Sequence, residues 1–224
     1  QPADLAVMQG WVHANSGNTP HLVFRKRIIT EQKRIGKHTL AIDSNLFLYK
    51  DLGNTKQYLR FSLDDVFPTT GNYFIDRINA NRWQQIKTDL NIDLKPWTNK
   101  GKHILICLQR NGGWSMAGMD VMEWCNVTIQ SIKQYTDRPI VVRAHPGEAS
   151  HYGGEKKTED ILHQWASNGQ LSVINADAKI NTYGLMECCS FGVVFSSTTG
   201  IEMAMLGKDV VVGSNVYYGQ KGFT

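Results

Sequence analysis

No run of eighteen apolar residues occurs in the 224-residue sequence, so it contains no candidate membrane-spanning helix. The chain opens with Gln1-Pro2-Ala3-Asp4, without an initiator Met or a basic-then-apolar leader, and we therefore expect no secretory signal. Only four cysteines are present, and none has Cys-x-x-Cys spacing, which favours reduced thiols over a disulfide framework. We expect a cytoplasmic protein, either free, peripheral at the inner membrane, or in the cytoplasm of a phage-infected host.

Two common phosphate-binding patterns are also missing. Neither G-x-x-x-x-G-K-S/T nor G-x-G-x-x-G after a strand occurs, which argues against ATPases and simple dehydrogenases. The sequence has no Cys/His spacing typical of a metal site and no Asp-x-Asp pair that would hold a divalent cation. We therefore expect no metal and no required cofactor.

The net charge of +4 is unevenly divided along the chain. Residues 1–100 carry 14 Lys or Arg against 9 Asp or Glu, whereas residues 101–224 carry 10 against 11. Six basic residues lie within residues 25–37, and such a concentration suits a polyanionic partner because Lys and Arg bind anionic groups electrostatically. We expect this surface to bind an acceptor through Arg25, Arg27 and Lys33.

Residues 98–224 alternate between short apolar runs and amphipathic stretches. This alternation is typical of a doubly wound parallel sheet, which we expect here as a Rossmann-like domain. The expected strands are 103–108, 139–142, 171–174, 192–195 and 209–212, and the expected helices are 120–135, 158–165 and 200–206.

A polar stretch from Lys95 to Lys102 marks the boundary with a second, less regular α/β domain, residues 1–97. Between residues 45 and 80, aromatic and turn residues alternate without a clear period. The elements expected in this domain are strands at 5–8 and 39–42, a basic helix at 20–35 and a helix at 81–90.

Ligands of open parallel sheets bind outside the carboxyl ends of the strands, so the loops that follow the strands form the candidate site. Hydroxyls and amide groups at the start of a helix favour an anion, although Ser and Thr are also ordinary helix caps. Three donor-rich loops at one sheet edge predict a site for a nucleotide phosphate or sugar phosphate. The donors are Gln109, Arg110 and Ser115 in the first loop, Arg143 and His145 in the second, and Ser196, Ser197 and Thr198 in the third.

The second half also resembles the bacterial capsule polysaccharide synthesis proteins, specifically the Kdo transferases. The resemblance covers roughly 120 residues and rests on the order and spacing of several short motifs. They are Gln109 with Ser115, Arg143-Ala144-His145-Pro146, Ser197-Thr198-Thr199-Gly200-Ile201-Glu202-Met203-Ala204, Gly207-Lys208-Asp209-Val210 and Tyr218-Gly219-Gln220-Lys221-Gly222-Phe223-Thr224.

This resemblance implies a GT-B glycosyltransferase, with two Rossmann-like domains facing across a cleft and the second holding a CMP- or UDP-linked sugar. It also implies that His145, Ser196 and Ser197 bind the donor phosphate, with Glu202 in the same motif. The family has an acidic Glu-Asp-Gly-Phe-x-Arg-Ser segment in its first domain, and here only the acid and the aromatic of Ile42-Asp43-Ser44-Asn45-Leu46-Phe47 match it. Phe223 replaces the usual Leu.

We therefore expect a metal-independent glycosyltransferase in which Asp43 activates the acceptor, with Asp64 and Asp65 as rival carboxylates. The acceptor is a polyanion, either a capsule-type glycan or glycolipid or the hydroxymethylated DNA that phage enzymes modify. The alternative is a non-catalytic module that binds a nucleotide sugar or a nucleic acid. A sugar-nucleotide epimerase is a third reading, but it needs more acidic residues than Glu148 and Glu202 at the second half's sheet edge.

Overall fold

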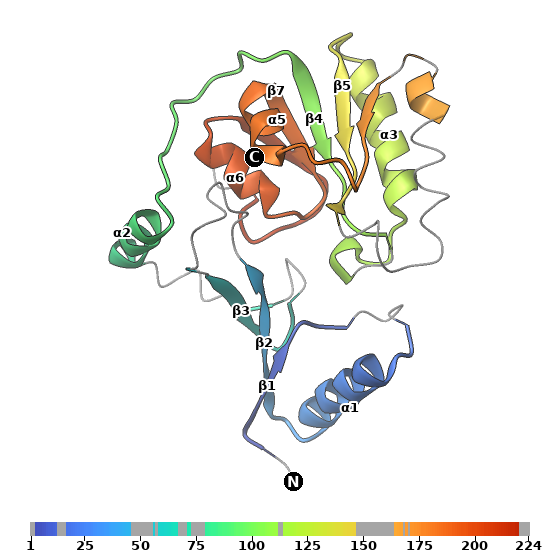
Figure 1. Ribbon diagram of the computed structural model, residues 1–224. Coiled ribbons are helices and arrows are strands. Elements are labelled where there is room, and N and C mark those ends of the chain that lie inside the picture. The colour runs from blue at the N-terminus through green and yellow to red at the C-terminus, as the bar shows by residue number, and fades with distance from the viewer. Residues whose placement is uncertain are drawn as a thin grey trace. The chain divides into compact units, whose positions relative to one another are not determined.

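The chain folds into two compact α/β units, Gln1–Asp93 and Leu94–Thr224, in a computed structural model (Figure 1). No helix among the described residues is long and apolar enough to cross a membrane. The structure describes residues 3–12, 17–45, 56, 58–66, 71–72, 79–111, 114–146, 164–167, 169 and 171–219.

The second unit is built on a sheet of five parallel strands in the order β6-β5-β4-β7-β8, which confirms the expected five-stranded parallel sheet. The strand order reverses between β4 and β7, which makes the crevice at their carboxyl ends the topological switch point where ligands of such sheets bind. The strands are β4 (His103–Cys107), β5 (Ile140–Arg143), β6 (Ser172–Ile174), β7 (Cys189–Val194) and β8 (Asp209–Val212).

Helices cover both faces of this sheet, as its fully buried strands require (Figure 1). Ile104 and Ile106 of β4 pack in one apolar cluster with α3 (Val121–Lys133). Leu105 and Cys107 point the other way and join a cluster with α5 (Thr182–Cys188) and α6 (Thr199–Met205). The alternation of side chains along β4 therefore produces a doubly wound layer arrangement.

The expected helices of this unit are only partly accounted for. α3 corresponds to the helix expected at 120–135. It begins after Asp120, which caps it: the Asp120 carboxylate accepts hydrogen bonds from the N–H groups of Met122 and Glu123 at 2.8 and 3.0 Å. Of the helix expected at 158–165, only 164–167 is described as helical, and the rest lies outside the described residues. α5 was not predicted at all.

The polar stretch that begins at Lys95 is attached to the second unit by backbone hydrogen bonds. The N–H of Lys95 donates to Met205 O (2.9 Å), and the N–H of Thr98 donates to Gly207 O (2.8 Å). Gly207 has a φ of +70°, and a Cβ atom there would lie 2.1 Å from the Pro96 carbonyl oxygen. A glycine is therefore required where this stretch crosses the end of α6.

The first unit contains a three-stranded sheet, β1 (Leu5–Gln9), β2 (His38–Asn45) and β3 (Leu59–Leu63). β1 and β2 are parallel, whereas β3 pairs with β2 in antiparallel orientation. β3 was not predicted. Its five residues lie between residues 45 and 80, where we found no clear period. The unit also contains α1 (Pro20–Arg34) and α2 (Ala80–Asp89).

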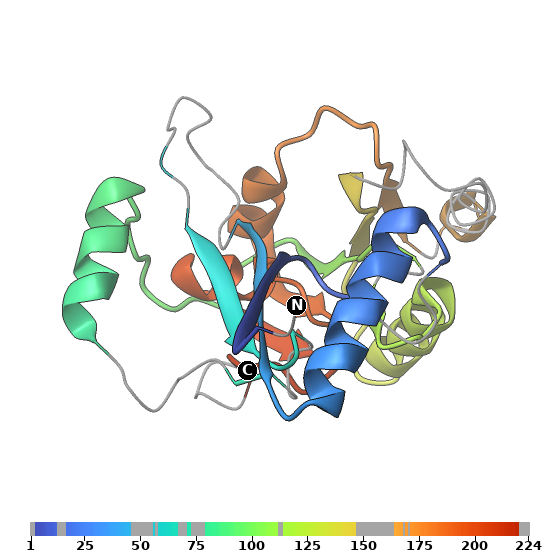
Figure 2. The ribbon, with the colours of Figure 1, turned by 90° about the horizontal axis from the view of Figure 1, so that it is seen from below.

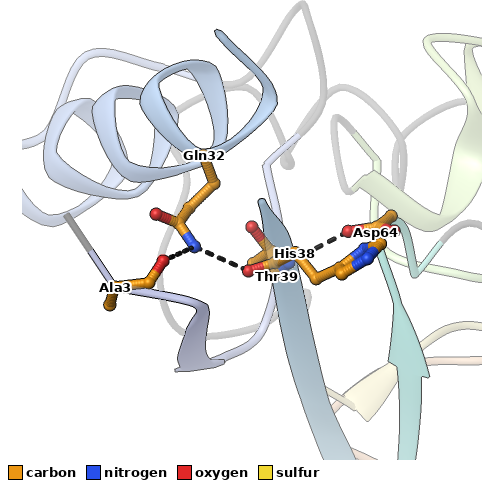
Figure 3. Close-up of polar contacts among 5 residues, drawn as sticks. All are labelled: Ala3, Gln32, His38, Thr39 and Asp64. Carbon is orange, nitrogen blue, oxygen red and sulfur yellow. Dashed lines mark hydrogen bonds and ion pairs between the residues drawn. The ribbon is translucent and has the colours of Figure 1, made fainter. Parts of the chain in front are cut away.

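α1 lies alongside β1 and is fastened to the sheet by one buried amide (Figures 2 and 3). The Nε2 group of Gln32 donates to the carbonyl oxygens of Ala3 at 3.1 Å and of His38 at 2.7 Å. These carbonyls lie at the beginnings of β1 and β2. A single side chain therefore connects the C-terminal part of the basic helix to the starting edge of the two parallel strands.

All four cysteines are free thiols. Burial raises the pKa of Cys107 and Cys125 to about 12 and the pKa of Cys189 to about 11. Cys188, at the end of α5, is exposed.

Candidate functional site

The side chain of Gln109 connects the ends of β4 and β7 at the switch point. Its Oε1 atom accepts a hydrogen bond from the Ser196 N–H at 2.9 Å and lies 3.0 Å from Ser196 Oγ. Both residues are buried. Two of the predicted site residues, 87 positions apart in the sequence, are thus brought into direct contact.

Ser196 also reaches the loop that follows β4. Its Oγ atom lies 2.8 Å from the carbonyl oxygen of Ser115, in the short 3₁₀ helix η1 (Trp114–Met116). A hydroxyl has one hydrogen, so Ser196 can donate either to Gln109 or to Ser115 at a given moment. This arrangement holds the first and third donor-rich loops together.

Ser197 shapes the turn that begins α6. Its Oγ atom accepts a hydrogen bond from the Thr199 N–H at 3.3 Å and is hydrogen-bonded to Thr199 Oγ1 at 2.9 Å. The N–H groups of Gly200 and Ile201 donate to the carbonyls of Ser197 and Thr198. The N–H groups of Thr199, Gly200 and Ile201, at the start of this seven-residue helix, are therefore used within the turn.

A tyrosine from the C-terminal motif packs against the same turn. The hydroxyl of Tyr218 donates to the Ser197 carbonyl, and the residue is buried. A Cβ atom at Gly200 would lie 2.8 Å from that hydroxyl, so the glycine of the Ser-Thr-Thr-Gly motif makes room for the ring. Sequence reasoning did not assign Tyr218 to the site, although the motif that contains it was recognised.

His145 lies two residues beyond β5, in an electropositive environment. Burial lowers the pKa of His145, and the nearby positive charges of Arg110 and Arg143 lower it further. The imidazole is therefore predominantly neutral near pH 7, and it can donate one N–H. The same two charges that disfavour a protonated histidine favour a bound anion.

Arg143 is committed to the fold. Its buried guanidinium donates to the carbonyl oxygen of Asn175 and, at 3.3 Å, to that of Ala178. These bonds hold the segment after β6 against the end of β5. The direct contact of Arg143 with a phosphate stays a prediction. The bonds to Asn175 and Ala178 hold its positive charge at a fixed position.

Glu202 lies inside the second unit, with no exposed surface. Burial raises the pKa of Cys107 and of Tyr183, and the charge of Glu202 raises both pKa values further, so Glu202 lies in the neighbourhood of both side chains. Nothing in the sequence indicated that Tyr183, on the unpredicted helix α5, belongs to this neighbourhood.

Asp43, the expected catalytic carboxylate, lies within β2 rather than after it. Its backbone pairs with Arg60 of β3, next to a shift in register between Asp43 and Asn45. Such irregularities often occur beside active sites, where they redirect a side chain. The side chain of Asp43 lies outside the described residues.

The three expected acceptor-binding residues of α1 differ in environment. Arg25 is partly buried, whereas Arg27 and Lys33 are exposed. A Cβ atom at Gly10, directly after β1, would lie 3.3 Å from Nη1 of Arg25. Arg25 is thus the member of this set that reaches the sheet.

The rival carboxylates, Asp64 and Asp65, are held in the turn after β3. Asp64 accepts from the Thr39 N–H at 2.9 Å and pairs with His38 Nδ1 at 2.7 Å, as Figure 3 shows. Burial raises the pKa of Asp64, but these hydrogen bonds and the His38 charge outweigh it and leave a lowered pKa. Asp65 accepts from the Val66 N–H at 2.7 Å. The two Asp64 contacts connect the turn to β2, whereas the Asp65 contact stays within the turn.

We expect Asp64→Ala to destabilise the protein by about 1–2 kcal/mol in urea unfolding, because the Thr39 N–H loses its partner. The lowered pKa means that this contribution is present above pH 4 and is lost as the pH falls through the folded-state value. Asp4→Ala is the control, since its ion pair with Lys37 is highly exposed and is expected to contribute less than about 0.5 kcal/mol. Equal effects of the two substitutions at pH 7 would contradict this prediction.

The part of the chain that the structure describes contains no group of three or more His, Cys, Asp or Glu side chains able to hold a metal ion. The side chains described above at the sheet edge carry hydroxyl, amide, imidazole and guanidinium groups.

Among the solved structures similar to this chain are two that are named Kdo transferases. KpsC from Thermosulfurimonas dismutans, beta Kdo 2,4 transferase, gives a TM-score of 0.59 at 17% identity over 96% of this chain and 71% of that one. KpsC from the same organism, beta Kdo 2,7 transferase, gives 0.51 at 16% identity over 83% of this chain and 60% of that one. No protein-family model and no curated protein matches the sequence. At these identities, the similarity establishes that the chain shares the fold of the two Kdo transferases.

Proposed function

We propose that the protein is a glycosyltransferase that binds a nucleotide sugar, CMP- or UDP-linked, at the carboxyl edge of the β4–β7 sheet. One observation carries this proposal. Polar side chains from three loops follow the neighbouring strands β4, β5 and β7 at the carboxyl edge of a sheet whose fold is shared with two Kdo transferases. They are Gln109 after β4, His145 after β5, and Ser196 and Ser197 after β7. The two-domain GT-B arrangement implied by the resemblance, divided at residues 97 and 98, is part of the proposal.

The chemistry of transfer explains why such donors are useful. As the bond between the sugar and the nucleotide breaks, the departing phosphate gains negative charge. Fixed donors and the charges of Arg110 and Arg143 then stabilise the transition state more than the ground state. The chemistry proposed here requires a carboxylate in the first unit, for which Asp43 is the candidate, and no metal.

A glycan or glycolipid is the proposed acceptor, in line with the names of the similar structures, which are Kdo transferases. Modified DNA, the other expectation, is favoured only by the basic residues of α1. The non-catalytic alternative accounts equally well for a nucleotide site, so the test of function has to separate binding from turnover.

Thermal unfolding with CMP, UDP and GDP tests the binding half of the proposal. A nucleotide at 100 times its dissociation constant stabilises the folded state by about 2.7 kcal/mol, which raises the melting temperature of a unit of this size by about 5–10 °C. We expect CMP or UDP to produce this shift and GDP to produce less. Release of free nucleotide from CMP- or UDP-sugars without acceptor then tests turnover. Binding without release would support the non-catalytic module, and no shift with any nucleotide would contradict the proposed site.

A further inference from the structure

Side chains of the basic helix α1 reach both ends of the strands β1 and β2, their beginnings and their carboxyl ends. Arg25 and Gln32 are seven residues apart, about two helical turns, and therefore lie on the same face of α1. Gln32 binds the carbonyls at the beginnings of β1 and β2. Arg25 lies beside Gly10, at the opposite, carboxyl edge of the same two strands.

This carboxyl edge also contains the backbone of Asp43. The N–H of Gly10 donates to the carbonyl of Ile42 at 2.7 Å, and Asp43 is the next residue in β2. Because β1 and β2 are parallel and in register up to Gln9 and Ile42, the positions after them are neighbours. The topology therefore brings the guanidinium of Arg25 and the backbone of Asp43 to the same end of the sheet.

Within the part of the chain that the structure describes, Arg25 has no counterion, whereas Arg34 and Lys37 each have one. Arg34 pairs with Glu31 at 2.6 Å, and Lys37 pairs with Asp4 at 2.7 Å. Among the residues that the structure describes, none forms an ion pair or hydrogen bond with the Arg25 guanidinium, although the residue is partly buried. A positive group that is partly removed from water and lacks a partner favours an external anion.

Gly10 determines how that anion can approach. Its φ is +73°, a conformation that side-chain-bearing residues rarely adopt, and a Cβ atom would lie 3.3 Å from Nη1 and 3.6 Å from Cζ of Arg25. The guanidinium thus lies directly over bare backbone at the end of β1.

We propose that Arg25 is a specificity-determining residue that binds a phosphate or carboxylate of the acceptor at this edge. The identification of that anion as part of an acceptor rests on the proposed function, whereas anion binding at Arg25 does not. Arg27 and Lys33, which are exposed, contribute only long-range attraction. The acceptor class that follows is a glycan or glycolipid carrying an anionic group close to the hydroxyl that receives the sugar.

The test is an NMR titration of the full chain with inorganic phosphate. We expect the Nε–Hε signal of Arg25 and the backbone amide of Gly10 to shift together in the wild-type protein. In Arg25→Gln, we expect the Gly10 shift to require about ten- to a hundredfold more phosphate, because a charge-assisted hydrogen bond is lost. Arg25→Lys keeps the charge but loses the planar pair of donors and should be intermediate.

Arg34→Gln is the matched control, since it removes the same charge from the same helix at a residue already paired with Glu31. We expect it to change the phosphate affinity by less than about twofold. Two results would overturn the proposal: no shift at Gly10, or equal losses in Arg25→Gln, Arg27→Gln and Arg34→Gln. Equal losses would indicate a diffuse attraction of α1 for any polyanion, DNA included.

Two further arms separate this proposal from the proposed function and identify the source of the anion. The Gly10 shift should persist in His145→Ala, so a failed nucleotide site leaves the Arg25 result intact. Sedimentation with phosphatidylglycerol vesicles, absent with phosphatidylcholine alone and lost in Arg25→Gln, would assign the anion to a lipid headgroup. Vesicle binding that is absent or independent of Arg25, with the phosphate shift intact, would assign it to a soluble acceptor.

Discussion

His145→Ala is expected to lower the rate of sugar transfer by about a hundredfold or more while leaving the fold intact. The loss of one donor from an analogous oxyanion site costs about 2.7–4 kcal/mol of transition-state stabilisation. His145 lies in a loop after β5, outside both apolar clusters of the second unit, so its removal leaves the core packing unchanged. Turnover and melting temperature measured on the same preparation test both halves of this expectation.

The pH dependence of nucleotide binding distinguishes a direct contact from an indirect one. The pKa of His145 is lowered in the free protein, and a bound phosphate would raise it, so binding takes up a proton. Affinity should therefore increase as the pH falls through the window between these two values, and His145→Ala should lose this increase. His21→Ala, at an exposed histidine of α1, is the control. A pH profile that is identical in wild type and His145→Ala would exclude a direct contact with phosphate.

Gly207→Ala is expected to destabilise the second unit by about 3 kcal/mol. The left-handed conformation of Gly207 costs an alanine about 1–2 kcal/mol, and the clash of its Cβ with the Pro96 carbonyl adds a similar amount. The atoms that this Cβ would meet belong to the backbone of Pro96 and Lys95, which cannot move away as a flexible side chain could. Urea unfolding followed by tryptophan fluorescence measures the change.

Gly169→Ala separates the two contributions to that cost. Gly169 has a φ of +68°, close to that of Gly207, but no atom lies within 4 Å of the position of a Cβ atom there. We expect this control to cost only about 1–2 kcal/mol. If the two variants are equally destabilised, the attachment of the residues around Pro96 contributes nothing to stability.

The regular parts of the fold were predictable because local pattern and tertiary environment agree. His103–Cys107 is a short apolar run whose five residues are all buried, and it forms the central strand expected of it. β3 was missed although Leu59, Phe61 and Leu63 alternate with Arg60 and Ser62. The run is only five residues long, and its alternation does not mark the buried face, because Leu59 and Phe61 are exposed and Ser62 is buried. Its place in the sheet depends on pairing with β2 instead.

The candidate site was predictable as a set of loops but not as a set of contacts. Because ligands bind at the carboxyl ends of parallel strands, Gln109 and Ser196 could be assigned to the site from the sequence. Their hydrogen bond, however, depends on β4 and β7 being neighbours in the sheet, which no local sequence pattern reveals. The hydrogen bonds of the Arg143 guanidinium could not be predicted either, because its acceptors are carbonyl oxygens of residues 174–178, about thirty positions away in the sequence. The burial of Glu202 likewise follows from the packing of α6.

The reactivity of the cysteine thiols in the second unit can be used to measure how often this unit unfolds. Alkylating reagents react with thiolates, and the raised pKa values of Cys107, Cys125 and Cys189 keep these groups protonated as well as inaccessible. Exposed Cys188 should therefore take up the first equivalent of a maleimide in the native protein. The other three should be modified only when the second unit unfolds and exposes them. The increase in mass of the labelled protein with time therefore measures the rate of this unfolding at high maleimide concentration.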